Sequence, residues 1–81
     1  MLHALVMQVA VRYYAMLRER RGRDSERVVV SEGTTARQLY AQLFEPPRVP
    51  VQVAVQHRVV PMETVLRDGD EVVFLPPVGG G

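Results

Sequence analysis

The chain has 81 residues, enough for one small domain whose core leaves little room for a deep active site. The formal net charge of +1 gives no field typical of a nucleic-acid or membrane-surface binder. Cysteine is absent and all ten basic residues are arginine, which excludes disulfides, thiolate metal sites, cysteine nucleophiles and Schiff-base chemistry at lysine side chains.

The first part of the chain predicts two strands joined by a helical turn. Side chains alternate with period two over residues 7–14, which is typical of a strand. The stretch "YAMLRERRG" is rich in helix formers and ends at Gly22, so a helical turn is predicted over 15–21. "ERVVVS" (26–31) predicts a second strand, which returns beside the first because the connection is short. Since the alternation begins at Met7, residues 1–6 are interpreted as an N-terminal extension with no role in the fold.

The middle of the chain carries the main helix. Apolar residues recur at i, i+3, i+4, i+7 and i+8 over residues 36–44, which places them on one helical face. Thr35 and Gln38 have the spacing of a capping box. Pro46-Pro47 ends the helix because proline lacks the amide that a further turn needs.

The remaining segments predict three more strands, over 51–56, 58–60 and 72–75, with a tight turn at Asp68-Gly69. The last strand is apolar throughout, as expected of a central strand that is covered on both sides or packed between neighbours. An α+β fold follows: one main helix on a mixed sheet of four to five strands, with the first and last long strands in the middle. This is the β-grasp, or ubiquitin-like, arrangement. We expect it over residues 7–77, followed by a flexible glycine tail over 78–81.

The charged clusters do not form a catalytic constellation. Asp68, Asp70 and Glu71 lack the spacing of a calcium loop and are interpreted as a solvated turn. The arginines of 18–23 suit a solvated helix C-terminus, with phosphate or acidic-surface binding as the alternative. The two histidines are far apart in sequence, so a metal site is not expected.

The C-terminal stretch "DEVVFLPPVGGG" is the most informative part of the sequence. Pro76-Pro77 is stiff and extended, so it would hold the tail away from the domain. The six residues after Leu75 can reach roughly 20 Å, and glycines 79–81 lack the Cβ atoms that would block a narrow channel. The reactive group at the tip is the α-carboxylate of Gly81, which is a poor acyl donor until another enzyme activates it.

These residues resemble a known family. "DGDEVVFLPPVGGG" is similar to the end of molybdopterin synthase small subunits, which typically close on "DGDEVAFFPPVxGG". The capped helix and the strand "VQVAVQ" also align, and "VRYYAMLRERRG" is similar to the first strand and helical turn. The resemblance covers about 7–81 and leaves residues 1–6 outside.

The resemblance implies a ubiquitin-like sulfur carrier of molybdenum cofactor biosynthesis that is not catalytic on its own. An adenylyltransferase of the ubiquitin-activating type would adenylate Gly81 with ATP. A sulfurtransferase or cysteine desulfurase would supply sulfur for a thiocarboxylate. The carrier would then donate that sulfur to cyclic pyranopterin monophosphate to form molybdopterin. No cofactor is expected on this chain itself.

The resemblance also implies a large-subunit partner, in a heterotetramer. A cytoplasmic location is expected because no apolar stretch approaches the ~20 residues of a membrane span and the N-terminus has no basic leader. No nucleic-acid or membrane partner is expected. The partner-binding positions that it implies are Tyr14, Val59, Leu75, Pro76, Pro77 and Val78, and the tail is formed by Gly79, Gly80 and Gly81.

Three alternatives share the same residues. A related sulfur carrier could serve tRNA thiolation or thiamine thiazole synthesis. A protein modifier would be conjugated to target lysines through Gly81. A plain ubiquitin-like interaction module would keep its function after Gly80 and Gly81 were removed.

Overall fold

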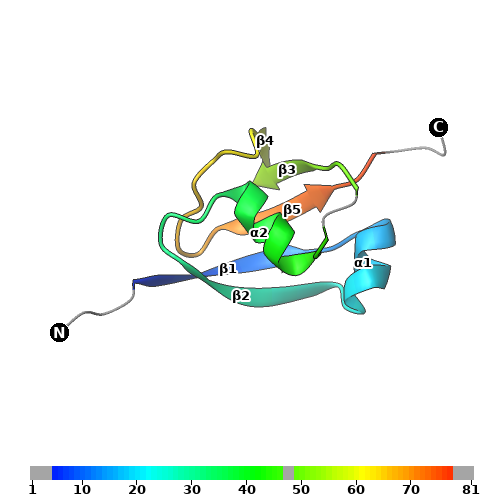
Figure 1. Cartoon of the computed structure of the whole chain (residues 1–81), viewed down its shortest axis with the longest axis horizontal. Coiled ribbons are helices and arrows are strands. Elements are labelled where there is room, and N and C mark those ends of the chain that lie inside the picture. Colours follow the sequence, from blue (N-terminus) through cyan, green and yellow to red (C-terminus); the bar gives the residue numbers. More distant parts are fainter. Residues whose placement is uncertain (1–4, 47–48, 78–81) are drawn as a thin grey trace.

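A computed structural model describes residues 5–46 and 49–77, which form one sheet with two helices (Figure 1). Each predicted helix and strand is present within one or two residues of its predicted bounds. The first strand begins at Val6, one residue before the alternation, because Val6 pairs with Ser31 although its side chain is exposed. The elements in chain order are β1 (Val6–Arg12), α1 (Ala15–Arg21), β2 (Ser25–Ser31), α2 (Ala36–Leu43), β3 (Gln52–Val55), β4 (Arg58–Val60) and β5 (Glu71–Leu75).

The sheet has the strand order β2-β1-β5-β3-β4. The two central strands, β1 and β5, run parallel, while the other neighbouring pairs are antiparallel. This confirms the predicted placement of the first and last long strands at the centre of a mixed sheet. The physical reason is that burying a strand between neighbours costs least free energy when its side chains are apolar. The arrangement is the predicted β-grasp fold.

The helix α2 lies across one face of this sheet and forms the core with it (Figure 1). The helix begins at Thr35, where both hydrogen bonds of the predicted capping box with Gln38 are present. Every second residue of the central strands points toward α2. These side chains pack against the apolar face of the helix and form one apolar layer with it. The buried residues of this layer include Val9, Val11, Ala36, Leu39, Tyr40, Phe44, Val53, Val72 and Phe74.

The opposite face of the sheet, called the open face below, is partly exposed. Val73 and Leu75 of β5 point to it, and neither is fully buried, whereas Val72 and Phe74 are buried under α2. The strand β5 is therefore packed between neighbours rather than covered on both sides, which decides between the two arrangements predicted for it. Register places Arg12, Val73, Ala54 and Val59 in one row across the open face.

Neither helix in the described ranges is long and apolar enough to cross a membrane.

Candidate functional site

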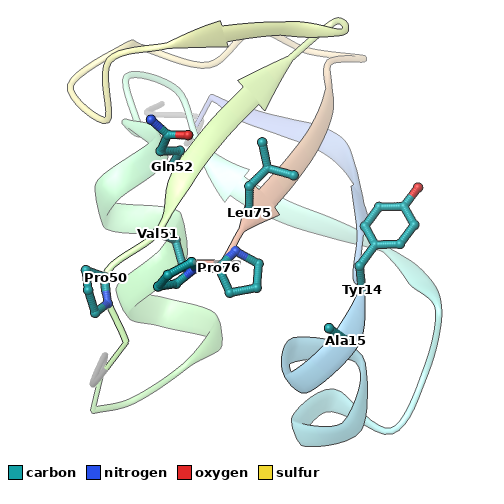
Figure 2. Close-up of a pocket in the computed structure, with 8 residues that line it drawn as sticks. Tyr14, Ala15, Pro50, Val51, Gln52, Leu75 and Pro76 are labelled. Atoms are coloured by element: carbon teal, nitrogen blue, oxygen red, sulfur yellow. The ribbon is translucent and has the colours of Figure 1, made fainter. Parts of the chain in front are cut away.

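An apolar groove lies at the end of β5, on the open side of the sheet (Figure 2). It has a volume of about 790 Å³ and is called the β5-end groove below. Its lining comes from three segments that are far apart in sequence: the start of α1, the entry into β3 and the end of β5. The lining residues are Tyr14, Ala15, Pro50, Val51, Gln52, Leu75, Pro76 and Pro77.

Leu75 occupies the middle of this groove because of strand register. It pairs with Gln52 of β3, and the alternation of β5 directs its side chain to the open face. Figure 2 shows Leu75 between β3 and Tyr14. Pro76 and Pro77 follow at once, and because proline has no backbone amide, the ladder with β3 cannot continue through them. Any segment attached after Pro77 is therefore joined to the domain at the groove.

Tyr14 forms the opposite wall. The alternation of β1 continues past the strand end, so Tyr13 is buried in the core and Tyr14 points outward with 49% of its surface exposed. The next residue, Ala15, has a φ of 50°, in the left-handed region that costs a residue with a Cβ atom about 1 kcal/mol or more. This abrupt turn lets α1 begin directly after Tyr14 and keeps the aromatic ring at the groove.

A polar network holds α1 in position beside the groove. The carboxylate of Glu26, in β2, accepts hydrogen bonds from the Tyr13 hydroxyl at 2.5 Å and from Arg21 Nε at 2.8 Å. Arg21 also donates to the backbone carbonyl of Leu43, at 3.2 Å, and so connects α1 with the end of α2. The Glu26 side chain is only 11% exposed, so the network is shielded from water and stronger than a surface ion pair.

The pKa values of this network follow from burial and hydrogen bonding. Burial, followed by the hydrogen bond to Glu26, raises the pKa of Tyr13 well above its ordinary value. Burial acts to raise the pKa of Glu26 as well, but the hydrogen bonds from Tyr13 and Arg21 outweigh it, so the pKa of Glu26 is lowered. The folded state therefore favours ionised Glu26.

We expect Glu26→Gln to lower the free energy of unfolding at pH 7 by ~1–3 kcal/mol, because it leaves Arg21 with a weaker acceptor. The pKa of Glu26 is lower in the folded than in the unfolded chain, so its contribution is present above the unfolded value of about 4.3 and is lost as pH falls through the folded value. Urea unfolding from pH 7 down to about pH 3 should thus show a smaller acid-induced loss for the variant than for the wild type.

Glu63→Gln provides the control, because Glu63 pairs with Arg37 on the exposed surface. It should change stability little at either pH. Equal acid sensitivity of Glu26→Gln and the wild type would contradict the assignment of Glu26.

The structure brings together four of the residues predicted to bind a partner: Tyr14, Leu75, Pro76 and Pro77 all line the β5-end groove. Val59, on β4, is 63% exposed and lies on the same open face, but it does not line the groove. The remaining predicted site residues, Val78, Gly79, Gly80 and Gly81, lie outside the described residues.

Four lining residues were not predicted: Ala15, Pro50, Val51 and Gln52. The alternation around 51–56 indicated that Gln52 points away from the core, but not which strand it pairs with. Pro50 and Val51 precede β3 and reach the groove only because β3 lies next to β5. Pairing of strands that are distant in sequence was thus the missing information.

The charged clusters have structural partners. Asp68 Oδ1 accepts from the amide of Gln8, and Asp70 Oδ2 accepts from that of Arg67, as in a hydrogen-bonded turn. Arg18 pairs with Asp24 at 2.8 Å. Arg21, by contrast, is engaged in the network around Glu26 and is not simply a solvated residue of the helix end. No group of three His, Asp or Glu side chains within residues 5–46 and 49–77 is arranged to hold a metal ion.

Comparison with known proteins gives a consistent set of relatives. The sequence matches the ThiS family over residues 11–81. It is 40% identical over 83 residues to a Mycobacterium tuberculosis protein named molybdopterin synthase sulfur carrier subunit, covering 94% of this chain and 100% of that protein. The structure of a putative molybdopterin converting factor, subunit 1, from Pyrococcus furiosus is similar with a TM-score of 0.78 and 30% identity, covering 89% of this chain and 99% of the other.

Two further structures extend the comparison. A chain in the complex of subunits 1 and 2 of the molybdopterin-converting factor from Helicobacter pylori has a TM-score of 0.56 and 28% identity, with 93% of this chain and 100% of that chain covered. The small archaeal modifier protein 1 of Haloferax volcanii, at 19% identity and a TM-score of 0.76 over 89% and 99% of the two chains, shares the fold. The resemblance predicted from the C-terminal stretch is confirmed, and the chain belongs to the ThiS family.

Proposed function

We propose that this chain is the sulfur-carrying small subunit of a molybdopterin synthase. The observation that carries the proposal is the 40% identity to a molybdopterin synthase sulfur carrier subunit over that protein's whole length. The β5-end groove supports this role, because it offers an apolar surface for a partner where the chain leaves β5. In this proposal the chain carries the reagent, while the ATP site and the catalytic groups belong to its partners.

The proposed chemistry takes place at the α-carboxylate of Gly81. One carboxylate oxygen attacks the α-phosphorus of ATP on an adenylyltransferase of the ubiquitin-activating type, and pyrophosphate leaves. The terminal sulfur of a persulfide on a sulfurtransferase or cysteine desulfurase then attacks the acyl carbon and AMP leaves. A thiol cleaves the resulting acyl disulfide by forming a disulfide with the donor's sulfur, which releases the thiocarboxylate. Transfer of this sulfur to cyclic pyranopterin monophosphate, with water supplying the replacing oxygen, returns Gly81 to a carboxylate. The chain needs no bound cofactor for these steps.

The docking partner in this proposal is the large subunit of the synthase. The relative from Helicobacter pylori is known as a complex of subunits 1 and 2, which supports a two-subunit assembly. The β5-end groove would receive an apolar part of the large subunit, and Val59 would extend the contact across the open face. Docking there would place the base of the tail at the partner's surface, so that the glycines enter its active site. A heterotetramer and a cytoplasmic location complete the proposal.

The test is the intact mass of untagged protein isolated from its own cells. Replacement of one carboxylate oxygen by sulfur adds about 16 Da, the same as oxidation of one of the four methionines, so the sample is also alkylated with iodoacetamide. An alkylated adduct localised to Gly81 is expected. An unmodified carboxylate, even after incubation with the adenylyltransferase, ATP and a sulfur donor, would contradict the proposal. Isopeptide-linked adducts through Gly81 would instead indicate a protein modifier.

A further inference from the structure

The open face of the sheet is divided into an apolar half and a basic half. The apolar half lies over β5, β3 and β4 and presents Val73, Leu75, Ala54 and Val59, with Glu71 and Gln52 as the polar residues of the same face. The basic half lies over β1 and β2, where register places Arg12 beside Val73 and Arg27 beside Ala10, and where Val29 is an exposed apolar neighbour of Arg27. Arg12 is two residues before Tyr14 on the same side of β1, so the basic half is continuous with the β5-end groove.

Arg12 is only weakly neutralised within the chain. Its Nε lies 3.6 Å from Oε2 of Glu71, and its side chain is 56% exposed, so solvent screens the pair. The same carboxylate has His57 Nε2 at 3.4 Å on its other side. Because its pairing with Glu71 is long and exposed, Arg12 keeps the capacity to bind a second carboxylate.

Arg27 is exposed and takes part in none of the ion pairs formed among the described residues. Its cross-strand neighbour, Ala10, is small and uncharged, and it separates Arg27 from Glu71 of β5, with which Ala10 pairs on its other side. The nearby arginines differ in this respect, since Arg18 pairs with Asp24 and Arg23 pairs with Glu26. Arg12 and Arg27 are diagonal neighbours on adjacent strands and together form a small cationic patch, which borders the apolar half where Arg12 lies beside Val73.

We propose that Arg12 and Arg27 set the orientation of the large subunit, which must place carboxylates over β1 and β2 while its apolar side chains cover Leu75 and Val73. This inference rests on the proposed function, because it assumes that the large subunit docks at the β5-end groove. Covering a guanidinium group without an acceptor is costly, whereas a carboxylate matches its forked geometry. Charged groups beside an apolar contact fix its register and exclude partners of the wrong sign.

The chemistry of this patch is better suited to binding a protein partner than to binding a nucleic acid or an anionic membrane. Nucleic acids are held by many phosphate contacts, and anionic membranes by clusters of four or more basic residues. Here two arginines border an apolar surface on a chain of net charge +1. Two charges beside an apolar contact are typical of a protein interface with a polar rim.

The experiment is calorimetric titration of the full chain into the purified large subunit at about 50 mM and about 500 mM NaCl, where the Debye length falls from over 10 Å to a few Å. The wild type should bind more weakly at the higher salt concentration. The double variant Arg12→Glu/Arg27→Glu should bind roughly 10-fold or more weakly at low salt, and its affinity should rise with salt because repulsion replaces attraction. Arg27→Glu alone should show the same change to a smaller extent, and it removes no ion pair from the chain.

Arg37→Glu is the matched control, because it changes the net charge by the same amount as Arg27→Glu but lies on α2, across the sheet from the open face. It should leave the affinity unchanged. Wild-type affinity for Arg12→Glu/Arg27→Glu, or an equal loss for Arg37→Glu, would overturn this inference while leaving the proposed function intact. Absence of binding by the wild type would overturn both, and the mass measurement would then show whether the chain carries sulfur at all.

Discussion

Removal of Gly80 and Gly81 is expected to abolish sulfur transfer, with a loss of more than about 100-fold in molybdopterin formation. Two extended residues span up to ~7 Å, so the shortened chain would end that far from the position the reaction needs. A misplacement of about 1 Å can already cost about 100-fold. The measurement is molybdopterin formation from cyclic pyranopterin monophosphate, with the large subunit, the adenylyltransferase, ATP and a sulfur donor present.

A chain that begins at Leu5 is the control for this truncation. Residues 1–4 precede β1, and their removal should leave product formation unchanged. Both truncated chains should unfold at nearly the temperature of the wild type, since the core residues lie between Met7 and Phe74. Full activity without Gly80 and Gly81 would contradict the carrier function and favour a plain interaction module.

The second large effect is expected for Leu75→Asp, which should weaken binding to the large subunit by more than about 100-fold. A carboxylate in the middle of the β5-end groove would have to be buried against an apolar partner surface without a compensating charge. Central apolar residues of an interface commonly account for most of its affinity. Titration calorimetry with the purified large subunit measures the change directly.

Val65→Asp is the matched control, because Val65 is an exposed apolar residue that lies outside the strands of the sheet and outside the groove. It should bind like the wild type. Leu75→Asp should keep a cooperative thermal unfolding transition, since Leu75 ends β5 and is only partly buried. Unchanged binding by a folded Leu75→Asp protein would show that the partner docks elsewhere.

These two variants separate the chemistry of the tail from docking. The truncated chain should still bind the large subunit through the groove, although it cannot deliver sulfur. Leu75→Asp should still accept sulfur at Gly81 if the adenylyltransferase binds through other residues, and intact mass would reveal this. The same assays therefore report on two different parts of the molecule.

The proposed carrier chemistry could be predicted from the sequence because it depends on local covalent features. The run from Leu75 through Pro76-Pro77 to the glycines needs no tertiary contact to predict a stiff base followed by a thin end. The order of strands and helices was likewise predicted correctly. Apolar residues recur with a period of two in the strands and of 3.6 over 36–44, and both periods are visible in the sequence itself.

The β5-end groove was only partly predictable. Tyr14 and Leu75 were expected to bind a partner, but Pro50, Val51 and Gln52 join them only through the pairing of β3 with β5. Val59 was predicted to belong with Leu75, and it does lie on the same face, yet β4 is the far edge strand and keeps it out of the groove. The division of the open face also depends on register, because a slip of one residue would turn Arg12 and Arg27 toward the core.

The sequence by itself determined the fold class and led to the prediction of a reactive end at Gly81, since both follow from residue type and short-range spacing. Only the tertiary structure decided which strand faces form a groove, that Arg21 and Glu26 hold α1 beside it, and that Arg12 lies beside Val73 on the open face. The physical reason is that these features arise from contacts between residues distant in the chain. Such contacts depend on the pairing and register of whole strands, which no local pattern specifies.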